Sequence, residues 1–139
     1  MSVKNLGNKE VAGISALLVH AAKIDENYTD KEKKIIISFI KSFIKKDENV
    51  EKIFEEAENL EKNSNQLLDF TKLIKNNSSE FKSIVVEELW KIIISNDISD
   101  EYESNLMRRI CGLIYFSDKL SGEIKMRLIA ERKKIDIHS

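Results

Sequence analysis

The sequence predicts an all-α fold, a compact bundle of about seven helices arranged as two three-helix units joined by a short helix. Three observations support this prediction. The 139-residue chain has no proline and only four glycines, the two residue types that most often interrupt helices. Its apolar residues recur at spacings of three and four over several turns, which is the period of an amphipathic helix. Strict alternation, which would indicate half-buried strands, occurs nowhere in the chain.

The first half of the chain is expected to form three helices, at about 10–24, 30–45 and 48–62. The first carries an apolar stripe that includes Val11, Ile14 and Leu18. The second begins with Thr29 and Glu32 in the spacing of a capping box, in which the two side chains satisfy each other's backbone N–H groups. The third follows Asp47, whose carboxylate suits the positive end of a helix dipole.

The second half repeats this pattern after a short helix at about 65–75, with helices expected at about 79–95, 100–115 and 119–134. The first of these begins near Ser78 and is the most apolar segment of the chain. The next begins with Asp100 and Glu103, again in the spacing of a capping box. The last follows Asp118, and its apolar stripe is expected to bury Leu120, Ile124 and Leu128.

An internal repeat relates the two halves. A shift of 71 residues aligns leucines, capping glutamates and the aspartates before the third helix: Leu18 with Leu89, Glu32 with Glu103, and Asp47 with Asp118. We therefore interpret residues 1–139 as one domain, with repeat one at about 10–62, a linking helix at about 65–75 and repeat two at about 81–134.

Composition excludes several classes of protein. The 23 Lys and Arg residues against 24 Asp and Glu residues give a net charge of -1, which argues against a nucleic-acid-binding protein because no positive excess can replace the counterions of phosphates. Aliphatic runs are far shorter than the roughly 20 residues that span a membrane. No glycine-rich phosphate loop, nucleophile elbow or catalytic triad is present, so we expect no enzyme. The single cysteine favours a reducing cytoplasm.

Three individual residues are interpreted structurally. His20 is expected to be a partly buried helix residue, because a zinc site or a catalytic relay would need partners that the sequence does not offer. Cys111 lies on an apolar helix face and is expected in the core. Trp90 is expected to pack in the core or between the repeats, where its indole N–H needs an acceptor.

The acidic face of residues 51–62 is expected to be solvated, with binding of a basic partner as the alternative.

Two strings, one in each half, carry the most specific signal. The first reads Leu17-Leu18-Val19-His20-Ala21-Ala22-Lys23-Ile24-Asp25 and leads to Glu32; the second reads Glu88-Leu89-Trp90-Lys91-Ile92-Ile93-Ile94-Ser95-Asn96-Asp97 and leads to Glu103. They resemble the two halves of the tellurite-resistance TerB family, LL-x-x-A-x-x-A-D-G … E and LW-x-x-A-x-A-D-G … E. The resemblance covers roughly residues 10–132 and implies a compact, pseudo-twofold helical bundle linked to tellurite and other chemical stress. The family's two turn glycines are replaced here by Glu26 and Asp97.

The resemblance also implies divalent-cation sites at the two acidic turns. Asp25 and Glu32 would be the principal oxygen ligands, and Asn96 and Glu103 a degenerate second pair in which an amide replaces a carboxylate. Calcium or magnesium would suit such oxygen ligands. In the alternative interpretation, Glu32 only caps its helix and the neighbouring carboxylates are solvated.

Two functions therefore stay open. The first is a non-enzymatic, cytoplasmic stress-response protein that binds a divalent cation at these turns. The second is a protein-interaction module similar to the helical domain of DjlA-type co-chaperones, in which the acidic turns only cap helices. We expect protein partners of unknown identity, no nucleic acid and no membrane span. Co-chaperone activity itself is not expected, because the sequence shows neither a J-domain nor a membrane anchor.

Overall fold

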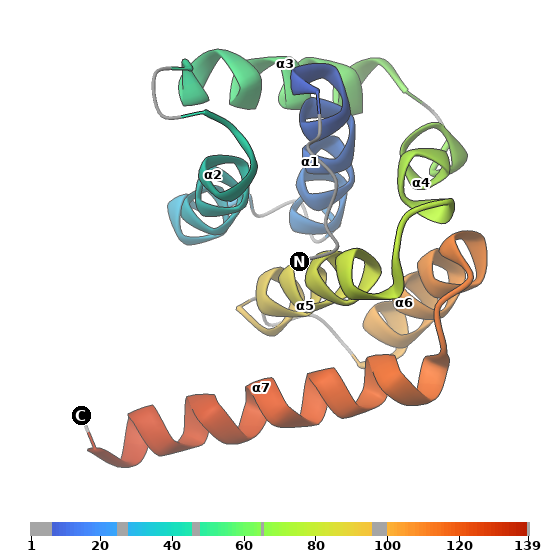
Figure 1. Cartoon of the computed structure of the whole chain (residues 1–139). Helices are drawn as coiled ribbons and strands as arrows, with labels where there is room; N and C mark the ends of the chain where they lie inside the picture. The colour runs from blue at the N-terminus through green and yellow to red at the C-terminus, as the bar shows by residue number, and fades with distance from the viewer. Residues whose placement is uncertain (1–6, 25–27, 46–47, 65, 96–99, 139) are drawn as a thin grey trace.

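Seven helices and no strand make up the described part of the chain, so the predicted all-α bundle is confirmed (Figure 1). The computed structural model describes residues 7–24, 28–45, 48–64, 66–95 and 100–138, and the side chains of 100–103 and 133–138 lie outside this description. The helices are α1 (Asn8–Ala22), α2 (Asp30–Phe43), α3 (Val50–Asn63), α4 (Leu68–Lys75), α5 (Ser79–Ile94), α6 (Asp100–Ile114) and α7 (Asp118–His138).

Hydrogen bonds at the helix starts confirm some of the predicted caps and correct others. Thr29 and Glu32 form the complete capping box of α2, and the hydroxyl of Ser78 accepts from the N–H of Phe81 at 3.1 Å to cap α5. Helix α3 is capped by Asn49, whereas Asp47 lies outside the described residues. At α7 the cap is the hydroxyl of Ser117, which accepts from the N–H of Leu120 at 3.3 Å.

Helix α1 lies at the centre of the bundle, in contact with α2, α3, α4 and α5 (Figure 1). Eleven of its 15 residues are buried, so apolar side chains are needed all round rather than on one stripe. Gly13 shows how closely a neighbour approaches, because a Cβ atom at this position would overlap the side chain of Leu73 on α4. The packing of α4 against α1 therefore depends on a missing side chain.

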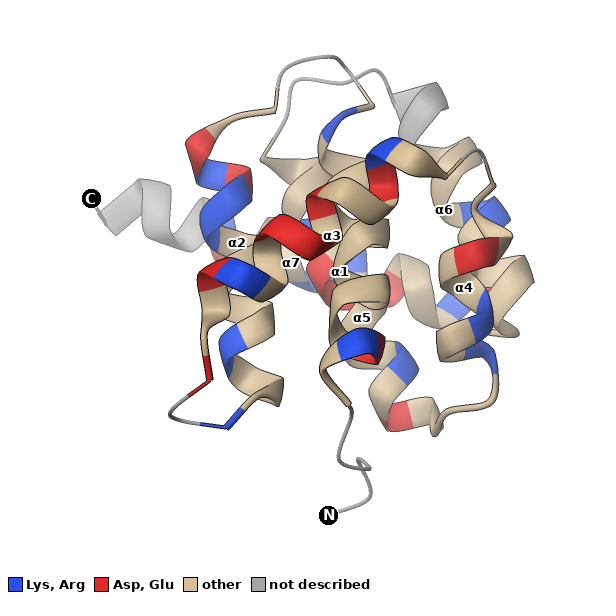
Figure 2. Cartoon of the chain, turned by 90° about the horizontal axis from the view of Figure 1, so that it is seen from above, with Lys and Arg blue, Asp and Glu red and all other residues tan. Residues whose placement is uncertain are grey.

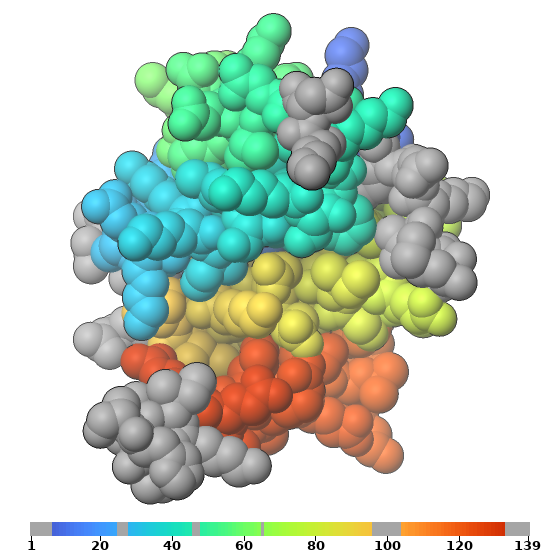
Figure 3. All heavy atoms as spheres, turned by 60° about the vertical axis from the view of Figure 1, so that its left-hand side comes forward, coloured from blue at the N-terminus to red at the C-terminus, as the bar shows by residue number. Residues whose placement is uncertain are grey.

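The second half lies beneath this centre. Helix α5 contacts both α1 and α2, and α7 packs along α5 (Figure 1). In the space-filling view, α2, α5 and α7 form successive layers from the upper to the lower part of the molecule (Figure 3). The sequence predicts that α7 buries Leu120, Ile124 and Leu128. Leu128 is buried and Ile124 is partly buried against the core, as predicted, whereas Leu120 is 47% exposed and the adjacent Ser121 is buried.

The described surface carries both signs of charge. Figure 2 shows acidic residues along α3 and basic residues on the neighbouring α2. None of the helices described is long and apolar enough to cross a lipid bilayer.

Candidate functional site

The predicted cation ligands are only partly described. Asp25 and Asn96 lie outside the described residues, and Glu103 is described only as backbone at the start of α6. Among the side chains that are described, no group of three or more His, Cys, Asp or Glu residues is placed to hold a metal ion. Glu32 is therefore the one predicted ligand whose environment can be examined, and the pairing of the four residues stays a prediction.

Glu32 is fully buried at the first turn of α2, which is unusual for a glutamate. Its Oε1 accepts hydrogen bonds from the backbone N–H of Thr29 at 2.7 Å and from the Thr29 hydroxyl at 2.9 Å. Its Oε2 is buried as well, but it has no hydrogen-bond partner within the described part of the chain. Half of the carboxylate is thus used as a helix cap, and the other half is left without a described partner.

Tyr28 lies close to further carboxylates at the same corner of the bundle. Burial, followed by the neighbouring charges of Glu58, Glu32 and Glu61, raises the pKa of the Tyr28 hydroxyl far above its ordinary value. The ring itself is flanked by ammonium groups, with Lys33 Nζ 4.9 Å from its centroid. Carboxylates from α2 and α3 therefore converge on the segment that follows α1, and negative potential accumulates there.

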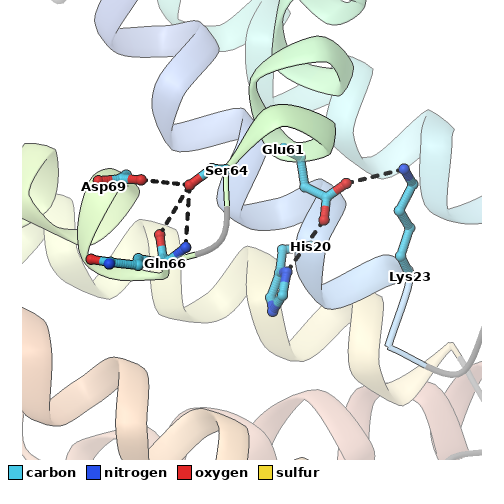
Figure 4. A network of polar contacts seen from close by, with 6 residues as sticks. All are labelled: His20, Lys23, Glu61, Ser64, Gln66 and Asp69. Carbon is cyan, nitrogen blue, oxygen red and sulfur yellow. Dashed lines mark hydrogen bonds and ion pairs between the residues drawn. The ribbon is translucent and has the colours of Figure 1, made fainter.

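Glu61 links α3 to α1 through a second polar contact that the sequence did not predict. Its Oε2 lies 3.3 Å from Nδ1 of His20, and its Oε1 accepts from Nζ of Lys23 at 3.0 Å (Figure 4). The Glu61 side chain is only 14% exposed. The expectation of a solvated acidic face is therefore wrong for Glu61, whereas His20 is partly buried, as expected, with its side chain 40% exposed. No local signal connects these residues, because they lie about 40 positions apart in the chain.

A small cavity opens beside this network, between α1, the connection from α3 to α4, and α6. Its volume is about 140 Å³. Glu61 and His20 form one wall, Arg109 of α6 contributes from the second half, and Leu67 and Phe70 supply apolar surface. The cavity thus combines residues from both halves of the chain, which is where ligand sites often occur in helical bundles.

In the second half of the chain, several side chains outside this site are hydrogen-bonded or buried in the core. Trp90 is buried and its Nε1–H donates to the hydroxyl of Ser121 at 2.9 Å, so it has the acceptor that its burial requires. Burial raises the pKa of the Cys111 thiol above its ordinary value, as expected for a core cysteine rather than a reactive one. Near the C-terminal part of α7, Nη1 of Arg132 donates to the backbone carbonyl of Ile94 at 2.6 Å.

Comparison with known proteins gives one match. The family model described as tellurite resistance protein TerB matches residues 12–126 of the chain. Neither the curated proteins nor the solved structures that were searched contain a match. The matched range includes most of α1, all of α2 to α6 and the first part of α7, and with them both turns at which the sequence resembles the family. The chain therefore belongs to the TerB family.

Proposed function

We propose that this protein is a non-enzymatic, cytoplasmic module of the TerB family that binds a divalent cation at the turn between α1 and α2 during chemical stress such as exposure to tellurite. The observation that carries the proposal is the buried carboxylate of Glu32, whose Oε2 has no hydrogen-bond partner within the described residues. A buried polar oxygen left without a hydrogen-bond partner costs roughly 1–3 kcal/mol, and more where the group is charged. A bound cation offsets that cost.

The chemistry of the site fits a hard cation. Calcium and magnesium prefer oxygen ligands, and carboxylates supply both the ligand atoms and the compensating charge. In this proposal Glu32 contributes its free oxygen and Asp25 contributes a second carboxylate from the turn. The neighbouring carboxylate of Glu58 adds negative charge, and burial together with this charge raises the pKa of Tyr28. The bound ion supplies charge neutralisation and fixes the turn.

The second turn is proposed as the weaker of the two. Asn96 supplies a neutral amide where the first turn has the carboxylate of Asp25, which leaves Glu103 as the charged member of the pair. Since calcium affinity follows the number of charged ligands, a cation is expected to occupy the first turn well before the second.

The rival proposal is a protein-interaction module in which Glu32 serves only as a cap. It is favoured by the complete capping box, which already uses Oε1 of Glu32 and the Thr29 hydroxyl without any ion. A basic protein partner could then meet the exposed glutamates of α3.

Calorimetric titration of the metal-free full chain with calcium, magnesium, manganese and zinc separates these proposals. The decisive variant is Glu32→Gln, because glutamine can still complete a capping box but carries no charge. We expect binding in the wild type, its loss in Glu32→Gln and in Asp25→Asn, and its retention in Glu55→Gln, a matched change at an exposed glutamate of α3. Absence of any binding tighter than about 1 mM, roughly 4 kcal/mol of binding free energy, would overturn the cation proposal.

A further inference from the structure

The cavity beside His20 presents one positive charge that no described residue neutralises. Glu61 forms part of its wall, but this carboxylate is already engaged by Lys23 and His20 (Figure 4). Arg109 also lines the cavity, and it makes no ion pair within the described part of the structure. Arg109 is therefore the lining residue whose charge is available to an anion, next to a carboxylate that is already compensated.

The remaining lining of the cavity includes two apolar side chains and one histidine ring. Leu67 and Phe70 are 6% and 5% exposed, and they line the cavity with hydrophobic surface. His20 uses Nδ1 toward Glu61, which leaves Nε2 for a ligand. A molecule with a short apolar body and one polar end matches this distribution.

Hydrogen bonds join three of the described residues on the α3–α4 side of the cavity. The Ser64 hydroxyl donates to Oδ2 of Asp69 at 2.6 Å and accepts from the N–H of Gln66 at 3.3 Å (Figure 4). Lining residues that are already held by such bonds lose less conformational entropy when a small ligand binds.

We propose that this cavity binds a small organic monocarboxylate, with the carboxylate on Arg109 and the apolar body on Leu67 and Phe70. Its volume of about 140 Å³ compares with the roughly 150 Å³ that accommodates benzene, so a ligand of about six non-hydrogen atoms fits. The planar guanidinium matches a carboxylate through two parallel hydrogen bonds. The single guanidinium group supplies one positive charge, which favours a monoanion over phosphate and sulfate.

The test is a titration of the isotope-labelled full chain with sodium propionate and sodium butyrate, followed by amide chemical shifts at constant ionic strength. We expect saturable shifts at Gln66, Leu67 and Phe70, with a dissociation constant of about 1 mM for a ligand of this size. Arg109→Gln should raise this constant at least tenfold. Arg108→Gln is the matched control, since it removes the same charge from an adjacent exposed residue that does not line the cavity.

Three results would overturn the proposal. They are shifts that do not saturate, equal effects of the Arg108 and Arg109 substitutions, and inorganic phosphate or sulfate binding at the same amides as tightly as the carboxylates. Because Arg109 is exposed, the loss of its charge should not prevent folding, which circular dichroism checks. The binding should also be unchanged in Glu32→Gln, so failure of the cation proposal leaves this one testable.

Discussion

The two halves of the molecule differ in charge at positions that the predicted 71-residue repeat relates to one another. In the first half, Lys23 near the end of α1 pairs with Glu61 of α3. Seventy-one residues later, the corresponding positions are Ile94 and Arg132, and here Arg132 donates to the backbone carbonyl of Ile94. In both halves a polar side chain on the third helix thus reaches the end of the first one, but the carboxylate has become a guanidinium.

The residues in and around the two turns also differ in charge. Glu58, which contributes to the raised pKa of Tyr28, corresponds to Ile129 on α7. Asp25 corresponds to Asn96. The first half therefore carries more carboxylates than the second at these corresponding positions. This difference supports placing the proposed cation site in the first half.

The largest expected effect is the loss of stability when a buried side chain at the α5–α7 contact is truncated. Trp90→Ala removes a buried ring and its hydrogen bond to Ser121, and should lower the free energy of unfolding by about 3–5 kcal/mol. Val19, the corresponding buried residue of α1, should cost only about 2 kcal/mol as alanine. Urea denaturation measures both changes. Equal losses would contradict the larger contribution expected from the Trp90 ring and its hydrogen bond to Ser121.

An intermediate effect is expected at the charged corner. Glu61→Ala leaves Lys23 and His20 without their carboxylate, and should cost about 1–2 kcal/mol because Glu61 is only 14% exposed. Arg132→Ala, at the corresponding position on α7, should cost less than about 1 kcal/mol because its partner is a single carbonyl. Chemical denaturation of both variants gives the comparison, and a larger loss for Arg132→Ala would reverse it.

The smallest change in stability is expected at the residues that follow α2 and α6. Tyr115 follows α6 with a φ of 57°, in the left-handed region, whereas Ile44, its counterpart after α2, is extended with a φ of −113°. Glycine adopts the left-handed conformation without a Cβ clash, so Tyr115→Gly should be more stable than Tyr115→Ala by about 1 kcal/mol. At Ile44 the order should reverse, with glycine about 0.5–1 kcal/mol less stable than alanine. Thermal unfolding of the four variants decides this, and the same order at both positions would contradict it.

Much of the fold was predictable because periodicity and capping are local signals. The spacing of apolar residues located all seven helices, and the Thr29 and Glu32 pattern located the start of α2. Periodicity could not indicate that α1 is surrounded on all sides, or that Leu120 faces solvent, because these depend on which helices become neighbours.

The candidate site was predictable only in part for the same reason. Glu32 was found because its spacing from Thr29 and from the α1 turn is short and recurs in the second half. The contact of Glu61 with His20 was missed because it joins residues 41 positions apart. Arg109, which lines the cavity beside them, lies even farther from His20 along the chain, so its contribution has no local signal either.

The most direct measurement of the central claim is the number of calcium ions bound per chain, determined by equilibrium dialysis. We predict one ion in the wild type, none in Glu32→Gln, and one in Glu103→Gln, because only the first turn has two charged ligands, Asp25 and Glu32. Two equivalent ions, or a loss in Glu103→Gln equal to that in Glu32→Gln, would contradict the asymmetry between the halves. No bound calcium in the wild type would contradict the assignment of Glu32 as a ligand for that ion.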